Sequence, residues 1–314
     1  MSEPAAAVLL EVEHSTAYGY ATPVTEAQHL AYLQPLQDAR QQLLQHGLQI
    51  EPAPSRRGED HDVFGNARTL FSLNQPHRAL QVLARSRLAL QPREAVDVAA
   101  SPPWEEVRQR LRYRARARYE PAAEFAQPSP FVPRLQALRD YALGCFAPGM
   151  PIALGAMSMM HRIRADFAFQ AGVTEVHTPL DRVLAQRRGV CQDFAHLMLG
   201  ALRMLGLAAR YVSGYLLTQP PPGQAPLVGA DASHAWVQVY CPDTPGLPEG
   251  WLDLDPTNDL VPDTGHVRLA LGRDYGDVTP LRGVIRGGGS HVLQVRVDTR
   301  RVTAPHQARM LLSS

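Results

Sequence analysis

The chain has no lysine among its 314 residues. Its 31 basic residues are therefore all arginines, and 30 acidic residues leave a net charge of only +1. A surface that binds nucleic acid usually shows as a clear excess of basic residues. We therefore expect no nucleic-acid partner, and the chain has no lysine amine of its own through which it could be cross-linked.

Cysteine is also scarce, with only Cys145, Cys191 and Cys241. Three cysteines without paired spacing exclude both a disulfide framework and a cysteine-rich zinc site. The acidic residues between 253 and 263 lack the glycine and the terminal glutamate of an EF-hand calcium loop. We expect reduced thiols, no metal and no cofactor.

Long hydrophobic runs are missing as well. The sequence contains no run of about 18 apolar residues that could span a membrane. Its start, MSEPAAAVLLEVEHS, lacks the basic first region of a signal peptide and soon reaches Glu11 and Glu13. We expect a cytoplasmic protein without a membrane partner, and the sequence indicates no particular oligomeric state.

The apolar content, 45%, is ample for a buried core. Residues 1–92 contain alternating apolar and polar runs separated by turn signals, which predict a β-rich domain. Residues 93–150 predict a helical connection, with helices over 104–118 and 132–146. Residues 151–314 predict a core of helices and strands that ends in a C-terminal strand, HVLQVRV, whose sheet the pattern leaves open. The predicted class is α+β.

The segment RRGVCQDFAHLMLGALRMLGL places Cys191 at the start of an expected helix, after a turn at Gly189. Unpaired N–H groups and the dipole at a helix N-terminus favour a thiolate and can bind an oxyanion. Apolar residues cover a wide arc of this helix, and Gly206 is its expected C-terminal stop. His196 lies ~140° around the axis from Cys191, so we expect a structural role for it, paired with Asp193.

Two later strands carry the other candidate residues. In SHAWVQVY, a period of two places His234 and Trp236 on one face, opposite small apolar residues that we expect to face the core. His234 and Trp236 are then expected to face a cleft. In WLDLDP, Asp253 and Asp255 share a face, and alternation does not choose between these two carboxylates.

A polar cluster follows at Arg273, Asp274, Tyr275 and Asp277. Two interpretations of it stay open. The cluster could line the cleft and bind a substrate carboxylate through the planar fork of the arginine. It could equally be an ordinary loop with an internal ion pair.

Cysteine, histidine and aspartate, in this order, suit acyl-enzyme chemistry. A thiolate attacks a carbonyl, a histidine passes the proton to the leaving amine, and a carboxylate fixes the imidazole tautomer. The product is a thioester. Each residue also has a plainer interpretation, because a single helical cysteine is commonly a small buried hydrophobe and an aspartate before proline is a common turn residue.

Three ordered blocks resemble the catalytic core of bacterial transglutaminase-like proteins, a branch of the papain-like cysteine superfamily. They are TPLDRVLAQRRGVCQDFAHLMLGALRMLGLAARYVSGYL, SHAWVQVY and DPTN. The segments HSTAYGY, DVFGN and PHRALQVLARS resemble the β-rich N-terminal region that accompanies this core, and HVRLALGRDYGDVTPLRG is similar to the segment that follows it. The resemblance implies a papain-like core in which a cysteine-bearing helix packs on an antiparallel sheet.

Position by position, the resemblance implies Cys191 as the nucleophile, His234 as general base and acid, and Asp255 as the orienting carboxylate. It places the aspartate directly before the proline, which favours Asp255 over Asp253. Trp236, Arg273, Asp274 and Tyr275 are further candidates for substrate binding.

The resemblance implies a peptide or protein substrate and a cysteine hydrolase or acyltransferase. It does not establish protein cross-linking, because the same core serves proteases, amidases and deglycosylating enzymes. The alternative is a peptide- or protein-binding scaffold that retains a non-catalytic transglutaminase-like core.

Overall fold

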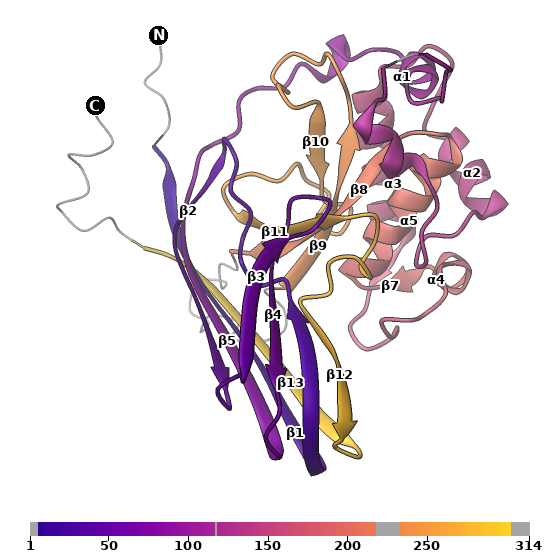
Figure 1. Ribbon diagram of the computed structural model, residues 1–314. Helices are drawn as coiled ribbons and strands as arrows, with labels where there is room; N and C mark the ends of the chain where they lie inside the picture. The colour runs from indigo at the N-terminus through magenta and orange to yellow at the C-terminus, as the bar shows by residue number, and fades with distance from the viewer. Residues whose placement is uncertain (1–5, 117, 218–232, 303–314) are drawn as a thin grey trace, which may run out of the picture.

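The computed structural model describes residues 6–116, 118–217 and 233–302, which form two main β-sheets and a group of helices (Figure 1). The first sheet contains β1 (Val8–Ala31), β2 (Gln41–Glu51), β3 (Arg56–His61), β4 (Ala67–Leu73), β5 (His77–Leu90), β12 (Leu281–Gly287) and β13 (His291–Arg301). The second contains β8 (Ala209–Leu216), β9 (Ser233–Tyr240), β10 (Trp251–Leu254) and β11 (His266–Gly272). The short strands β6 (Ala168–Phe169) and β7 (Arg188–Gly189) pair with each other.

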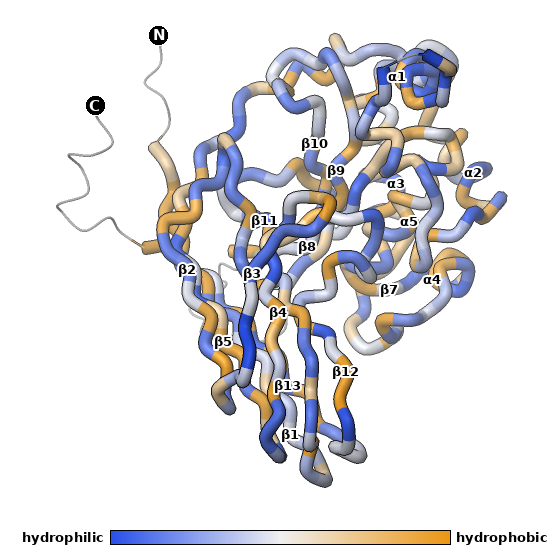
Figure 2. The backbone as a smooth tube through the Cα atoms, in the orientation of Figure 1, coloured by the Kyte–Doolittle hydropathy of each residue, from blue (hydrophilic) through white to orange (hydrophobic). Residues whose placement is uncertain are grey.

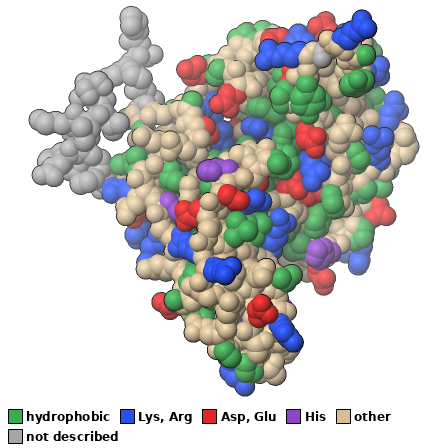
Figure 3. Space-filling view, viewed as in Figure 1, with side chains coloured by type: hydrophobic (Ala, Val, Ile, Leu, Met, Phe, Trp, Pro, Cys, Tyr) green, Lys and Arg blue, Asp and Glu red, His purple; other side chains and the backbone are tan. Residues whose placement is uncertain are grey.

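The helices lie together at one end of the molecule, beside the second sheet (Figure 1). They are α1 (Trp104–Arg110), α2 (Gln136–Leu143), α3 (Ile152–Asp166), α4 (Leu180–Gln186) and α5 (Cys191–Met204), with 3-10 turns η1 (Val98–Ala100) and η2 (Pro121–Ala126). No helix among the described residues is both long and apolar enough to cross a membrane. On the face shown in Figure 3, basic and acidic side chains are interspersed.

The first sheet is built around β1, the strand that pairs with four others. Its first part pairs with β5 and β13, and its last part pairs with β4 and β12. The ladder with β5 shifts register between Gly19 and Val24. Pro23 lies in this interval and has no N–H to donate to a ladder, so the change of partner falls where β1 pairs least well. Apolar and polar residues alternate along these strands (Figure 2).

The second sheet has the antiparallel order β10-β9-β8-β11. Helix α5 packs against β8 and β9. Ala235, Val237 and Val239 share one hydrophobic core with the apolar residues of α5, so the predicted inward face of this strand is confirmed. The predicted α+β class is confirmed too, because a β-rich N-terminal region precedes a cysteine-bearing helix packed on an antiparallel sheet.

The C-terminal strand of the predicted 151–314 core belongs to the first sheet. Both β12 and β13 pair with β1, so the chain returns to the sheet in which it started. Val297 of β13 is fully buried with Leu10 and with Tyr215 of the second sheet. Alternation predicted the strand but not its partner, because the partner depends on a cluster drawn from distant parts of the chain.

Two predicted helices are shorter in the structure. Helix α1 ends at Arg110 rather than at 118, and α2 covers Gln136–Leu143 rather than 132–146. Beyond α1 the side chains have little to bury: Tyr113 is 92% exposed, and Arg116 has a φ of 67°. A helix of this length is stabilised mainly by packing of an apolar face, which the arginine-rich segment lacks.

Candidate active site

The chain turns at Arg187, which ends α4 four residues before Cys191 and has a φ of 55°, in the left-handed region. The prediction that Gly189 makes this turn was wrong. Gly189 is needed for a different reason, because a Cβ there would lie 2.6 Å from Oδ2 of Asp193. That carboxylate oxygen accepts hydrogen bonds from the Val190 backbone N–H at 2.8 Å and from the Thr174 hydroxyl at 2.6 Å. Asp193 therefore fixes the backbone just before the cysteine.

Cys191 is the first residue of α5 and is half-buried, with a free thiol. Its position in the first turn puts it among the backbone N–H groups that have no partner within the helix. Cys145 and Cys241 are also free, but both are buried in the core. Burial raises the pKa of the Cys241 thiol far above its usual range. Among the three cysteines, Cys191 is the one that borders a cavity containing a histidine.

The cavity at Cys191 has a volume of about 320 Å³ and also contains His234. Ring atom Nε2 of His234 lies 2.8 Å from Oδ2 of Asp255. An ionised carboxylate can only accept a hydrogen bond, so Nε2 carries the proton that faces Asp255. The structure therefore brings the thiol, imidazole and carboxylate into one region, with Asp255 behind the histidine.

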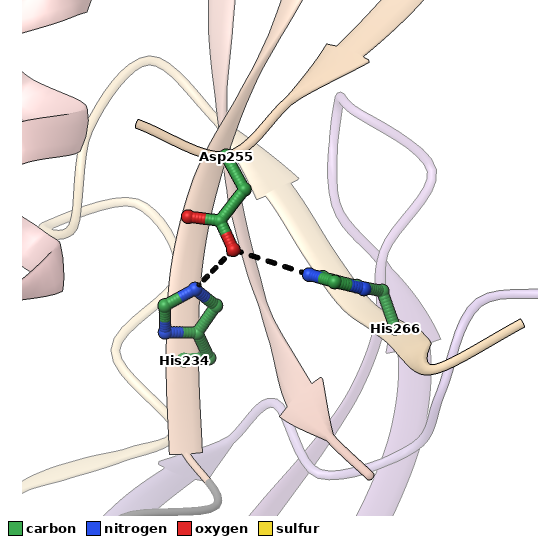
Figure 4. Close-up of side chains that lie close together, drawn as sticks. All are labelled: His234, Asp255 and His266. Carbon is green, nitrogen blue, oxygen red and sulfur yellow. Dashed lines mark hydrogen bonds and ion pairs between the residues drawn. The ribbon is translucent and has the colours of Figure 1, made fainter. Parts of the chain in front are cut away.

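Asp255 is fully buried and its two oxygens accept several hydrogen bonds. Oδ1 accepts the backbone N–H groups of Thr257 at 3.0 Å and Asn258 at 3.2 Å. Oδ2 accepts the Asn258 side-chain amide at 2.8 Å and, besides His234, Nε2 of His266 at 3.2 Å. Figure 4 shows both rings pointing at the same carboxylate oxygen. These donors hold the carboxylate in one orientation.

Sequence reasoning did not identify Asn258 or His266. Asn258 ends the DPTN block, so its closeness to Asp255 was available as a local turn signal. His266 lies at the start of β11, which reaches β9 only through β8. No local pattern reports a contact across two ladders, so His266 could be found only in the folded structure.

The pKa values of His234 and Asp255 are shifted in opposite directions by their contact. Burial lowers the pKa of His234, but the Asp255 hydrogen bond and the negative charge at Cys191 outweigh it and raise the pKa to about 10. Burial alone would raise the pKa of Asp255, but its hydrogen bonds to His234 and His266 hold it well below the usual range. The arrangement therefore favours a protonated imidazole beside the Asp255 carboxylate.

The structure distinguishes the two aspartates that alternation left equal. Asp253 accepts a hydrogen bond from Nε1 of Trp236 at 2.8 Å, and the structure places Asp255 rather than Asp253 against His234. Trp236 is fully buried, stacked beside the His234 ring with centroids 6.1 Å apart. The expectation that Trp236 faces the cleft was wrong, because Trp236 is buried in a cluster with Val212 and Leu271 of the same sheet, and Leu36, which follows β1, packs against this cluster.

The polar cluster after β11 divides into separate roles. Arg273 pairs with Asp277 through Nε and a terminal nitrogen, at 2.9 Å and 3.0 Å, which matches the internal ion pair rather than a cleft arginine. Asp274 is buried and accepts the backbone N–H groups of Phe131 and Gly276. Tyr275 is the member of the cluster that lines the cavity.

His196 is buried and has a structural role, as expected, but its partner differs from the prediction. Its Nε2 accepts the Tyr275 backbone N–H at 3.2 Å, whereas Asp193 is occupied by Val190 and Thr174. Burial lowers the pKa of His196 to about 3, so the ring is neutral. This hydrogen bond holds Tyr275 at the cavity.

One group of described residues has the ligand types and spacing for a metal ion: His234, Asp255 and His266, whose nearest ligand atoms all lie within 4.8 Å of one another. The hydrogen bonds already satisfy these atoms. A metal ion would bind the lone pair of each Nε2. Here each Nε2 instead carries a hydrogen that faces Oδ2 of Asp255, so it has no lone pair to offer. The geometry thus fits a hydrogen-bonded carboxylate, and the expectation of no metal stays a prediction.

Comparisons with known proteins agree with this architecture. Residues 10–89 match the bacterial transglutaminase-like N-terminal region, and residues 144–256 match the transglutaminase-like superfamily. An uncharacterized protein of Mycobacterium tuberculosis is 39% identical over 291 residues, which cover 91% of this chain and 91% of that relative. A protein-glutamine gamma-glutamyltransferase of Pseudomonas aeruginosa is 28% identical over 132 residues, 42% of this chain and 19% of that enzyme.

Among solved structures, a Cytophaga hutchinsonii protein provisionally named a cysteine protease has the same fold. The TM-score is 0.72 at 20% identity, over 96% of this chain and 93% of the other. The relatives and the fold lead to one conclusion: this chain belongs to the bacterial transglutaminase-like family, with its N-terminal region and its transglutaminase-like core.

Proposed function

We propose that this protein is a cysteine-dependent enzyme that forms a thioester at Cys191 from the acyl part of an amide in a peptide or protein. The observation that supports it most strongly is the buried His234–Asp255 pair in the cavity of a helix-start cysteine. The pair has the direction that the chemistry needs, since Asp255 occupies Nε2 and leaves Nδ1 toward the sulfur side.

In the proposed reaction, the Cys191 thiolate adds to the carbonyl carbon, forming a C–S bond while the electron pair moves onto oxygen. The Cys191 backbone N–H at the start of α5 is the candidate donor to this oxyanion. The carbonyl then re-forms, the C–N bond breaks, and the His234 imidazolium gives its proton to the leaving amine. Asp255 stabilises the charged ring and fixes its tautomer.

The thioester is then attacked by water, giving hydrolysis, or by an amine, giving transfer. In both cases His234 takes the proton of the attacking group. The proteins similar to this chain include one named a protein-glutamine gamma-glutamyltransferase and, in fold alone, one provisionally named a cysteine protease. A peptide or protein substrate in the cytoplasm is part of this proposal.

Alkylation tests the activated thiol. Iodoacetamide at neutral pH is expected to modify Cys191 at least tenfold faster than Cys145 or Cys241, because it is the half-buried thiol at a helix start. Peptide mass mapping at several times measures the three rates. His234→Ala is the matched variant, and it should slow alkylation of Cys191 alone. Equal rates at the three cysteines would contradict the proposal and leave the scaffold alternative.

The pH dependence of amide turnover tests the charge of His234. Although burial disfavours the charged ring, Asp255 and Cys191 raise its pKa to about 10, so the proton for the leaving amine is present below that pH and lost above it. We expect the alkaline limb of kcat/KM, which reports ionisations of the free enzyme, near pH 10, with circular dichroism showing that the fold survives there. An alkaline limb near 6.5, the ordinary histidine value, would contradict this assignment.

A further inference from the structure

The active-site cavity has walls from both sheets. Cys191, His234 and Tyr211 come from α5 and the second sheet, whereas Tyr18 of β1 and Leu293 of β13 come from the first sheet. An early strand, β1, and the last strand, β13, thus both contribute to the cavity that contains Cys191. A larger cavity of about 580 Å³ lies over β1, β2 and β5, is lined by charged residues such as Glu13 and Arg85, and contains no cysteine.

Uncharged side chains make up most of the cavity lining. Apolar and aromatic surface comes from Tyr18, Tyr275, Leu281, Leu293 and Val295, and the polar uncharged members are Thr16, Gln192, Ser213 and Ser233. The side chain of Leu293 is 48% exposed to solvent although it lines this cavity. Contact with a bound ligand would remove this apolar surface from water, which is favourable.

No arginine, aspartate or glutamate lines this cavity among the described residues. The nearest polar group of the first sheet, His14, is occupied: its ring nitrogens lie 2.9 Å from the Tyr215 hydroxyl and 3.2 Å from the Thr16 hydroxyl. Burial lowers the pKa of His14 to about 4, so the ring is neutral. Along the wall formed by β1 and β13, away from His234, a charged substrate group would lose water without gaining an opposite charge, which is costly.

We propose that this cavity is a subsite for a bulky uncharged side chain, aliphatic or aromatic, next to the amide that Cys191 attacks, and that β1 and β13 form its selective wall. The proposal rests on the proposed function, since it assigns the substrate class of the same site. Under this proposal the first sheet, through β1 and β13, takes part in substrate recognition.

Two irreversible probes of the thiol test the proposal in the full chain. They are peptidyl chloromethyl ketones that differ only in the last residue, phenylalanine or aspartate. We expect the phenylalanine probe to modify Cys191 at least about tenfold faster, the scale on which a hydrophobic pocket discriminates. Iodoacetamide, which is too small to need the subsite, gives the reference rate for the thiol itself.

The variant Leu293→Glu is expected to slow the phenylalanine probe about tenfold. Leu293→Arg is expected to speed the aspartate probe. Val292→Glu is the matched control: it is the neighbouring residue on β13, 64% exposed, and does not line the cavity. It should change neither rate. The iodoacetamide rate should stay constant in all three variants.

The outcomes separate this proposal from the proposed function. If iodoacetamide fails to modify Cys191 preferentially, the activated thiol is wrong. If iodoacetamide modifies it but the two ketones react equally fast, or Leu293→Glu and Val292→Glu behave alike, the thiol stands and the apolar subsite is overturned.

Discussion

Asparagine in place of Asp255 is expected to lower kcat for an amide substrate by about three to four orders of magnitude. The carboxylate accepts the Nε2 proton of His234 at 2.8 Å and thereby leaves Nδ1 free. An amide can present its NH₂ group to Nε2 instead, which favours the opposite tautomer, with the proton on Nδ1. That tautomer cannot take a proton from Cys191, and the imidazolium also loses its counter-charge.

The measurement is release of 4-nitroaniline from a peptide anilide, because this leaving amine must be protonated. Asp253→Asn is the matched control, since Asp253 is also buried, lies on the neighbouring strand β10 and bonds to Trp236 rather than to His234. We expect that variant to keep its kcat within about tenfold of the parent, as for other residues outside the reacting group. Equal losses in the two variants would mean that Asp255 acts on the fold and not on the histidine.

Arg203→Met is expected to lower the free energy of unfolding by about 3–6 kcal/mol. The guanidinium of Arg203 is buried and donates to the carbonyl oxygens of Phe125 at 2.9 Å, Ala209 at 2.9 Å and Arg273 at 2.5 Å. A methionine of similar length would leave these acceptors without a donor, and each buried unsatisfied group costs about 1–3 kcal/mol.

Urea denaturation measures the change, with Arg139→Met as the control because Arg139 is exposed on α2. The control is expected to stay within about 0.5 kcal/mol of the parent. Similar values for the two variants would show that the bonds of Arg203 contribute little. Because Arg203 also holds the backbone of Arg273, two residues before Tyr275, the unstable variant should lose preference for the phenylalanine probe before it unfolds.

The sequence predicts most reliably those parts of the site that depend on local pattern. The helix that starts at Cys191 has an apolar arc and ends at Met204, and Gly206, whose φ is 77°, follows two residues later as the stop. The Schellman bonds are present there, from Leu207 N–H to the Leu202 carbonyl and from Gly206 N–H to the Arg203 carbonyl. Propensity, burial and capping all agree along this segment.

Prediction fails where two faces of an element are both buried. Alternation correctly separated Trp236 from Val237, but it treats the polar face as the open one. In β9 the helices cover one face, and on the other face a second small cluster with Val212, Leu271 and Leu36 buries Trp236 although it lies opposite the core residues. The residues that complete the site, His266 and Leu293, come from β11 and β13, and their positions depend on packing between distant segments.

The pairing of β1 with β13 affects how the molecule is made. Leu10 faces Arg301 across this ladder, a separation of nearly the whole chain. Contacts of such long range form late, because the loop between them must close first. On the ribosome, the cysteine helix can therefore fold well before the wall that carries Leu293 exists. The subsite proposed above therefore exists only after the last strand has been made and has paired with β1.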